Sequence, residues 1–134
     1  MKHTVLLTIT SLLSITLMTL HLSDDMVRGF SEPGLDNLIG VAILVVWLNG
    51  TLMLAERRAG YVIMLLGAIF AAAMPVLHMR GASFTDTVRS SGGVFFFWTV
   101  FTLGVTGTFS LILAARSLWN PQWAQSRIFS RSDP

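Results

Sequence analysis

The stretch AGYVIMLLGAIFAAAMPVL, residues 59–77, decides the fold of this 134-residue chain. Its 19 residues carry no charge, and a helix of about 20 residues, rising about 1.5 Å per residue, crosses the ~30 Å hydrocarbon core of a bilayer. Three other stretches have a similar length and also lack an internal charge: residues 4–22, 38–55 and 94–115. The sequence therefore predicts an all-α integral membrane protein whose four transmembrane helices form an up-down bundle.

The composition agrees with a chain that lies mostly in lipid. Hydrophobic residues make up 53% of it and charged residues 12%, whereas a soluble domain has about 25% charged residues. We expect one membrane domain, residues 1–116, followed by a short cytoplasmic tail at the membrane surface, residues 117–134. A net charge of +2 is too small to favour nucleic-acid binding. The absence of cysteine excludes disulfides and thiolate metal ligands.

Basic residues divide unequally between the two sides that four spans create. Both termini and the turn Glu56-Arg57-Arg58 share one side, which carries six Lys or Arg residues against three on the other. The six are Lys2, Arg57, Arg58, Arg116, Arg127 and Arg131, and the three are Arg28, Arg80 and Arg89. Because short cytoplasmic loops are enriched in Lys and Arg, we expect both termini to be cytoplasmic, in a bacterial plasma (inner) membrane.

Two helix faces end in a histidine at the same side of the membrane. Side chains three and four residues apart share one face of a helix. The polar face of the first span carries Ser11 and Ser14 and ends at His21, and a face of small residues and Met74 on the third span ends at His78. Because both spans run outward, the two histidines should lie near the external boundary, where a compact bundle can bring them together.

A polar cap forms this external end, and it consists of His21, Asp24, Asp25, Arg28, His78, Arg80 and Asp86. His21, Asp24 and Asp25 lie within one helical turn. Asp24, Asp25 and Arg28 can instead form a local charge network, in which Asp25 and Arg28, three residues apart, can pair if the helix continues past the membrane. No catalytic signature accompanies the cap, so whether the chain is an enzyme stays open, and a non-catalytic role is favoured. We interpret the chain as a structural, assembly or partner-binding membrane component. Its partners would be the bilayer and either another membrane protein or a second copy of itself.

Two cofactor hypotheses are alternatives to this interpretation. The first is a divalent ion such as zinc, nickel or copper, held by nitrogen and oxygen ligands from His21, Asp24, Asp25 and His78. Nearby methionines would add soft ligands for copper: Met18, Met26, Met74 and Met79. The second is a b-type haem between the first and third helices, with His21 and His78 as its axial ligands.

A further alternative is a lipid-modifying enzyme. His21 or His78 would act as the general base with an aspartate to orient it, and Arg80 would receive a lipid phosphate. This hypothesis requires an open pocket at the depth of the membrane boundary.

Three local patterns predict how the helices begin and pack. Asn49 lies in the second span, where an unpaired amide is costly, and should hydrogen-bond to another helix. Asp36 and Asn37 precede that span and predict its N-cap. Gly104 and Gly107 give the fourth span a small-residue surface that allows another helix to approach closely.

The predicted orientation is testable with reporter fusions. Green fluorescent protein attached after Pro134 should fluoresce and alkaline phosphatase at the same position should stay inactive, because the C-terminus is expected in the cytoplasm. Fusions after Gly34, in the first expected external loop, should give the opposite result. An external signal from the Pro134 fusion would contradict the assignment of every loop.

Overall fold

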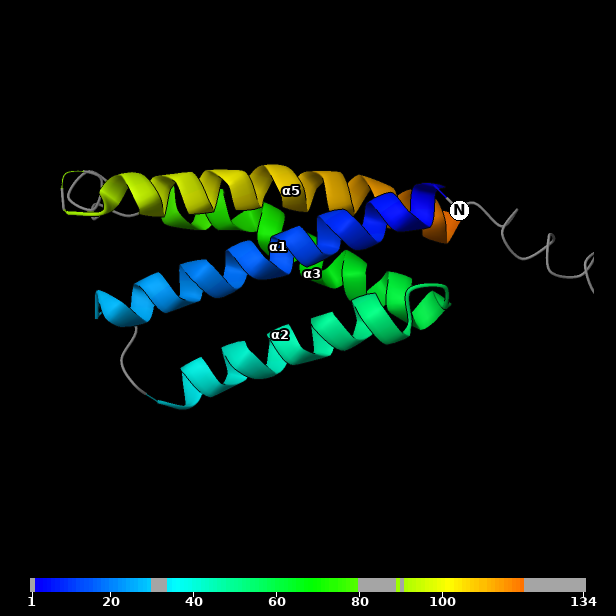
Figure 1. Cartoon of the computed structure of the whole chain (residues 1–134), viewed down its shortest axis with the longest axis horizontal. Coiled ribbons are helices and arrows are strands. Elements are labelled where there is room, and N and C mark those ends of the chain that lie inside the picture. Colours follow the sequence, from blue (N-terminus) through cyan, green and yellow to red (C-terminus); the bar gives the residue numbers. More distant parts are fainter. Residues whose placement is uncertain (1, 30–33, 80–88, 90, 120–134) are drawn as a thin grey trace, which may run out of the picture.

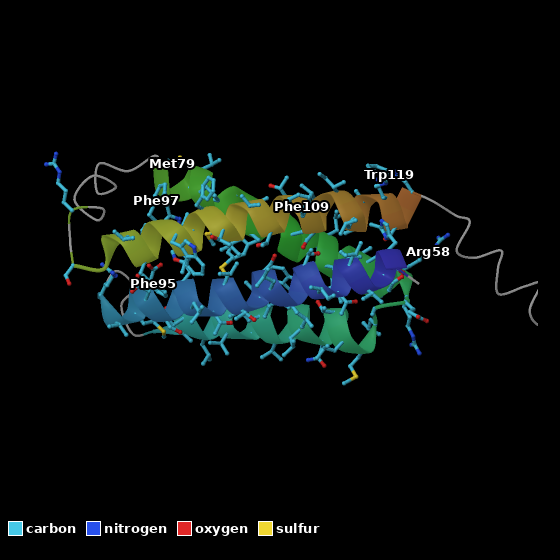
Figure 2. All side chains as sticks on the ribbon, turned by 45° about the horizontal axis from the view of Figure 1, so that its top comes forward. Arg58, Met79, Phe95, Phe97, Phe109 and Trp119 are labelled. Carbon is cyan, nitrogen blue, oxygen red and sulfur yellow. The ribbon has the colours of Figure 1, made fainter. Side chains whose placement is uncertain are left out.

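The computed structural model describes residues 2–29, 34–79, 89 and 91–119, and every structural statement below concerns this part of the chain. It contains four helices, α1 (Lys2–Val27), α2 (Leu35–Met53), α3 (Arg58–Met79) and α5 (Gly93–Trp119). Successive helices run in opposite directions, so the start of α1 and the end of α5 lie at the same end of the molecule (Figure 1). Figure 2 places Arg58 and Trp119 at that end and Met79 toward the opposite one. We name these the Arg58 end and the Met79 end.

The all-helical prediction is confirmed, and three of the helices are long and apolar enough to cross a membrane: His3–Val27 of α1, Arg58–Met79 and Gly93–Trp119. The apolar part of α2, Asn37–Met53, is shorter. Large apolar side chains such as Leu38 and Phe109 are more than half exposed, whereas the small polar side chains of Ser14 and Thr99 are fully buried. A soluble protein shows the reverse distribution, and a surface of this kind is suited to contact with lipid.

Several helices extend past the predicted bounds. α1 continues to Val27 instead of ending at residue 22, because the residues that follow include neither Gly nor Pro before its end. α2 begins at Leu35, so the predicted N-cap at Asp36 and Asn37 is wrong: Gly34 holds the N-cap position, and no side-chain cap bond is made there. α5 runs to Trp119, so residues 117–119 are helical instead of part of the tail. Residues 120–134 of the predicted tail lie outside the described residues.

Small residues allow α3 and α5 to approach closely. A Cβ on Gly104 would collide with the ring of Pro75, and a Cβ on Gly107 would collide with the backbone of Ala72. The predicted small-residue surface of α5 therefore faces α3. Close backbone approach of this kind gives dispersion contacts, which are a main source of helix association where lipid removes the hydrophobic driving force.

Hydrogen bonds inside the apolar region fasten α2 to α1. Trp47 Nε1 donates to Ser11 Oγ at 3.0 Å, and Ser11 Oγ lies 2.8 Å from Thr51 Oγ1. Thr51 Oγ1 in turn donates to the carbonyl oxygen of Trp47 at 2.9 Å, so Ser11 is the donor to Thr51. Each side-chain N–H or O–H hydrogen of Trp47, Ser11 and Thr51 thus has an acceptor, and burying these three groups leaves none of their hydrogen-bond donors unsatisfied. The Trp47 indole lies against Gly67 of α3, where a Cβ would collide with it.

The prediction that Asn49 bonds to another helix is wrong. Its side chain is exposed, and its Nδ2 donates to the carbonyl oxygen of Val45 on the same helix at 2.9 Å. A carbonyl one turn earlier is within reach of a short polar side chain. This local bond satisfies one of the amide donors and reduces the cost of the exposed position.

Gly67→Val should destabilise the fold, because the added side chain needs space that the Trp47 indole occupies. Overpacking a closely packed site costs about 1–3 kcal/mol, which predicts a lower unfolding temperature for the detergent-solubilised protein, followed by circular dichroism. Ala42→Val, on the exposed side of α2, is the matched control and should unfold at the wild-type temperature. Equal unfolding temperatures for the two variants would contradict this packing.

Candidate functional site

Two histidines and an aspartate meet at the Met79 end. His21 and Asp25 lie one turn apart on α1, and His78 lies in the last turn of α3. The two imidazole rings are in edge-to-face contact, with centroids 4.7 Å apart and an interplanar angle of 79°. His21 Nε2 lies 3.5 Å from Asp25 Oδ2. The structure thus brings together the two histidines that the sequence placed at one side of the membrane, and we name the three residues the His–Asp cluster.

Phe96 of α5 packs against both imidazole rings of the cluster. Its side chain is buried, and its ring centroid lies 5.4 Å from that of His21 and 5.4 Å from that of His78. α5 begins at Gly93, so Phe96 lies in its first turn. Its aromatic ring shields the histidines from one side, and His21 is only 3% exposed.

The atoms that face the two imidazole rings indicate which nitrogen of each ring carries the proton. His78 Nδ1 lies 3.0 Å from the carbonyl oxygen of Met74. A carbonyl oxygen only accepts, so Nδ1 carries the proton and the neutral ring keeps its lone pair on Nε2. His21 Nε2 faces the Asp25 carboxylate at 3.5 Å, which is an ion-pair distance. With its proton on Nε2, toward this acceptor, the neutral His21 ring would keep its lone pair on Nδ1. That Nδ1 and Asp25 Oδ1 are buried, and neither has a hydrogen-bond partner among the described residues. Within this part of the chain, the cluster therefore has more lone pairs than donors.

A surplus of lone pairs suits a cation. One ligand atom from each residue of the His–Asp cluster lies within 4.8 Å of the others. A tetrahedral ion bonded at about 2.1 Å holds its ligand atoms roughly 3.4 Å apart, so modest side-chain rotations would bring all three onto one ion. The bond from His78 Nδ1 to a backbone carbonyl is the outer contact that commonly orients a ligating histidine.

Asp24 turns away from the cluster and pairs with Arg28. Arg28 Nε lies 2.7 Å from Asp24 Oδ2, and Arg28 Nη1 donates to the carbonyl oxygen of Ser91 at 3.0 Å. Within the predicted charge network of Asp24, Asp25 and Arg28, the ion pair is thus the one between Asp24 and Arg28. α1 continues through these positions, and residues four apart on a helix meet at least as well as residues three apart. Asp24, a predicted metal ligand, lies outside the group of three that could hold an ion.

A cavity of about 140 Å³ lies beside the cluster, between α1, α2 and α3. All three cluster residues contribute to its wall, together with the sulfur-bearing side chains of Met18 and Met74. The other two methionines predicted as soft ligands, Met26 and Met79, do not line it and are about half exposed.

Sequence reasoning missed two parts of this site. It did not find the wall that α2 supplies, which includes Gly40, Ile43 and Leu44, and it did not find Phe96. Neither carries a signal in the sequence, because an apolar residue that lines a cavity and one that faces lipid are alike in type and spacing.

The spacing of the two histidines does not suit a b-type haem. Two axial imidazoles bond opposite faces of one iron at about 2 Å, which places their ring centroids roughly 6 Å apart with the porphyrin between them. The rings of His21 and His78 are in contact at 4.7 Å, which leaves no space for a porphyrin. A single ion bound at one side of both rings fits this arrangement better.

In comparisons with known proteins, no family model, no curated protein and no solved structure matches the chain. Arg80 and Asp86 of the polar cap lie outside the described residues, so their roles stay predictions. The lipid-modifying hypothesis, which needs Arg80, stays a prediction with them.

Phe96→Ala should lower the unfolding temperature, because it leaves a void against His21 and His78. The loss should be about 3 kcal/mol, the low end for removing a buried phenyl ring, since the surrounding lipid or detergent is also apolar. Phe95→Ala, a neighbouring and more exposed ring, is the control and should cost less. Thermal unfolding in detergent compares the two, and an equal loss would contradict the buried role of Phe96.

Proposed function

We propose that this chain is a transition-metal-binding protein of the bacterial plasma membrane that spans the bilayer four times. Three helices support the membrane-spanning part of this proposal, because they are long and apolar enough to cross a bilayer. α2 has 19 residues, which at about 1.5 Å per residue reach about 28 Å, close to the ~30 Å of the hydrocarbon core. Its exposed side chains, such as Leu38 and Val46, are also those of a lipid-facing helix.

In this proposal the Arg58 end faces the cytoplasm. Arg57, in the short connection between α2 and α3, and Arg58, the first residue of α3, are both exposed. Arginines at such a tight turn are retained on the cytoplasmic side. The start of α1 and the end of α5 lie at the same end (Figure 1), so both termini would be cytoplasmic. The His–Asp cluster then lies at the external side of the membrane.

One observation carries the metal proposal. Three potential metal-ligand atoms lie close together, and there are too few hydrogen-bond donors nearby to satisfy their lone pairs. A buried acceptor without a partner costs free energy, and one cation satisfies His21 Nδ1, or Nε2 after a ring rotation, together with Asp25 and His78. Two imidazoles and one carboxylate suit zinc, nickel or copper. Met18 and Met74 line the adjoining cavity, and thioethers favour copper in its reduced state. Three protein ligands would leave one position open for a further ligand.

A second, structural function fits the other part of the polar cap. Arg28 joins Asp24 on α1 to the carbonyl oxygen of Ser91, just before α5. A partly exposed ion pair contributes about 0–1 kcal/mol to stability. The main effect of these contacts is therefore to fix the position of the end of α1 relative to the start of α5. This is the part of the cap to which the interpretation as an assembly or partner-binding surface applies.

Purified, detergent-solubilised wild-type protein should bind about one copper or zinc ion per chain, measured by elemental analysis and by competition with a chromophoric chelator. His21→Ala, His78→Ala and Asp25→Asn should each weaken binding by at least about 100-fold, because each removes a ligand. Binding should also weaken as the pH falls, because protons compete with the ion for the imidazole lone pairs.

The chain offers a matched control for each type of ligand. Asp24→Asn changes a carboxylate next to the cluster that pairs with Arg28, and His3→Ala changes a histidine that lies near Ser117 at the Arg58 end. Both variants should keep the wild-type affinity. The proposal fails if the wild-type protein binds no metal, or if Asp24→Asn loses as much affinity as Asp25→Asn.

A further inference from the structure

The cavity beside the His–Asp cluster is much larger than a metal ion requires. Its volume is about 140 Å³. A water molecule occupies about 30 Å³ of liquid, and an apolar protein cavity of about 150 Å³ holds one benzene molecule. The space is therefore that of a single six-membered ring.

The cavity walls favour an apolar occupant over a group of waters. Leu22 of α1, Ile43, Leu44 and Trp47 of α2, and Phe70 of α3 all line it. A water in an apolar cavity lacks the two to four polar partners it needs. Polar partners lie only where the cluster meets the cavity, so the occupant should be apolar over most of its surface and polar at one position.

The cluster also determines which polar group that occupant carries. Its atoms without a partner among the described residues, His21 Nδ1 and Asp25 Oδ1, are acceptors and are themselves fully buried, so an occupant of the cavity would reach them after a small rotation of either side chain. A carbonyl or ether oxygen in the occupant would add another acceptor and leave these atoms unsatisfied. A hydroxyl group has a hydrogen to donate, and a neutral hydroxyl brings no net charge into the membrane.

We propose that the cavity binds a hydroxylated aromatic ring, with the ring among the apolar side chains of α1, α2 and α3 and the hydroxyl donating to His21 or Asp25. A soluble phenol and the ring of a membrane quinol share this chemistry. The inference goes beyond metal binding and does not require it, because the hydroxyl uses the lone pairs of the metal-free cluster.

Fluorine NMR of 4-fluorophenol added to the full-length, chelator-treated protein in detergent tests this inference. 4-Fluorotoluene is the matched probe, because it has nearly the same size and lacks the hydroxyl. We expect saturable binding of 4-fluorophenol and about tenfold or more weaker binding of 4-fluorotoluene, since a hydrogen bond to buried acceptors of this kind is lost. Equal affinities for the two probes, or no saturable binding of 4-fluorophenol, would overturn the proposal.

A pair of phenylalanine substitutions tests whether the probe binds in this cavity: one fills the cavity and the other lies outside it. Gly40 lines the cavity, and a Cβ there would lie 3.4 Å from Leu22 Cδ2, so Gly40→Phe should abolish binding of 4-fluorophenol. Val41→Phe adds the same ring to the exposed side of α2 and should bind as the wild type does. If Gly40→Phe does not fold, Ile43→Phe, which also narrows the cavity, replaces it. Equal binding by the filled variant and by Val41→Phe would place the probe elsewhere and overturn the proposal.

Two competing ligands show whether the natural occupant of the cavity is a soluble phenol or a membrane quinol. Hydroquinone without a tail and hydroquinone with a ten-carbon tail are each added to the complex with 4-fluorophenol. Displacement by the tailed molecule identifies a membrane quinol, and displacement by the untailed one alone identifies a small phenol. Failure of both to displace 4-fluorophenol contradicts a ring site.

The metal experiment and the ring experiment can fail separately. If 4-fluorophenol binds and no metal does, the metal-binding function is wrong and the ring site stands. If metal binds and 4-fluorophenol does not, the reverse holds.

Discussion

The absence of water inside a bilayer is the constraint on which the rest of this structure depends. A polar group that enters the membrane must find its hydrogen-bond partner within the protein. Helices satisfy the backbone, and side chains use the same carbonyls, as Ser14 does with Thr10. Trp47, Ser11 and Thr51 satisfy one another across α1 and α2. The large apolar side chains face outward and form a surface that is suited to contact with lipid.

The His–Asp cluster departs from this constraint. His21 Nδ1 and Asp25 Oδ1 are buried without partners, at the one place in the described residues where two histidines and a carboxylate meet. Ser110 Oγ is also buried without a partner among the described residues, but it stands alone, whereas two such atoms lie together in the cluster. A cost of this kind is carried most readily where a ligand removes it. Both proposals begin from this imbalance: the metal ion supplies a charge to the lone pairs, and the hydroxylated ring supplies a hydrogen.

Particular residues show how far prediction from the sequence reached. The meeting of His21 and His78 followed from span length and helical spacing, because two parallel spans of similar length end at similar heights. Which aspartate of the predicted charge network forms the ion pair with Arg28 did not follow, because this depends on how far α1 continues and on the position of Ser91. The local bond of Asn49 was missed for a related reason. Spacing shows which partners are near, but it does not rank them.

The sequence by itself determined that this chain is helical and suited to lipid, because uncharged stretches of about 20 residues have few other ways to satisfy their backbone and surface in a membrane. It also determined which helix ends carry histidine. Only the tertiary structure decided that Asp25 and not Asp24 joins these histidines, that Phe96 covers them, and that α2 completes a cavity beside them. Those features depend on how the helices are rotated and how closely they approach, and small residues such as Gly67 and Gly107 set that approach through contacts with distant segments.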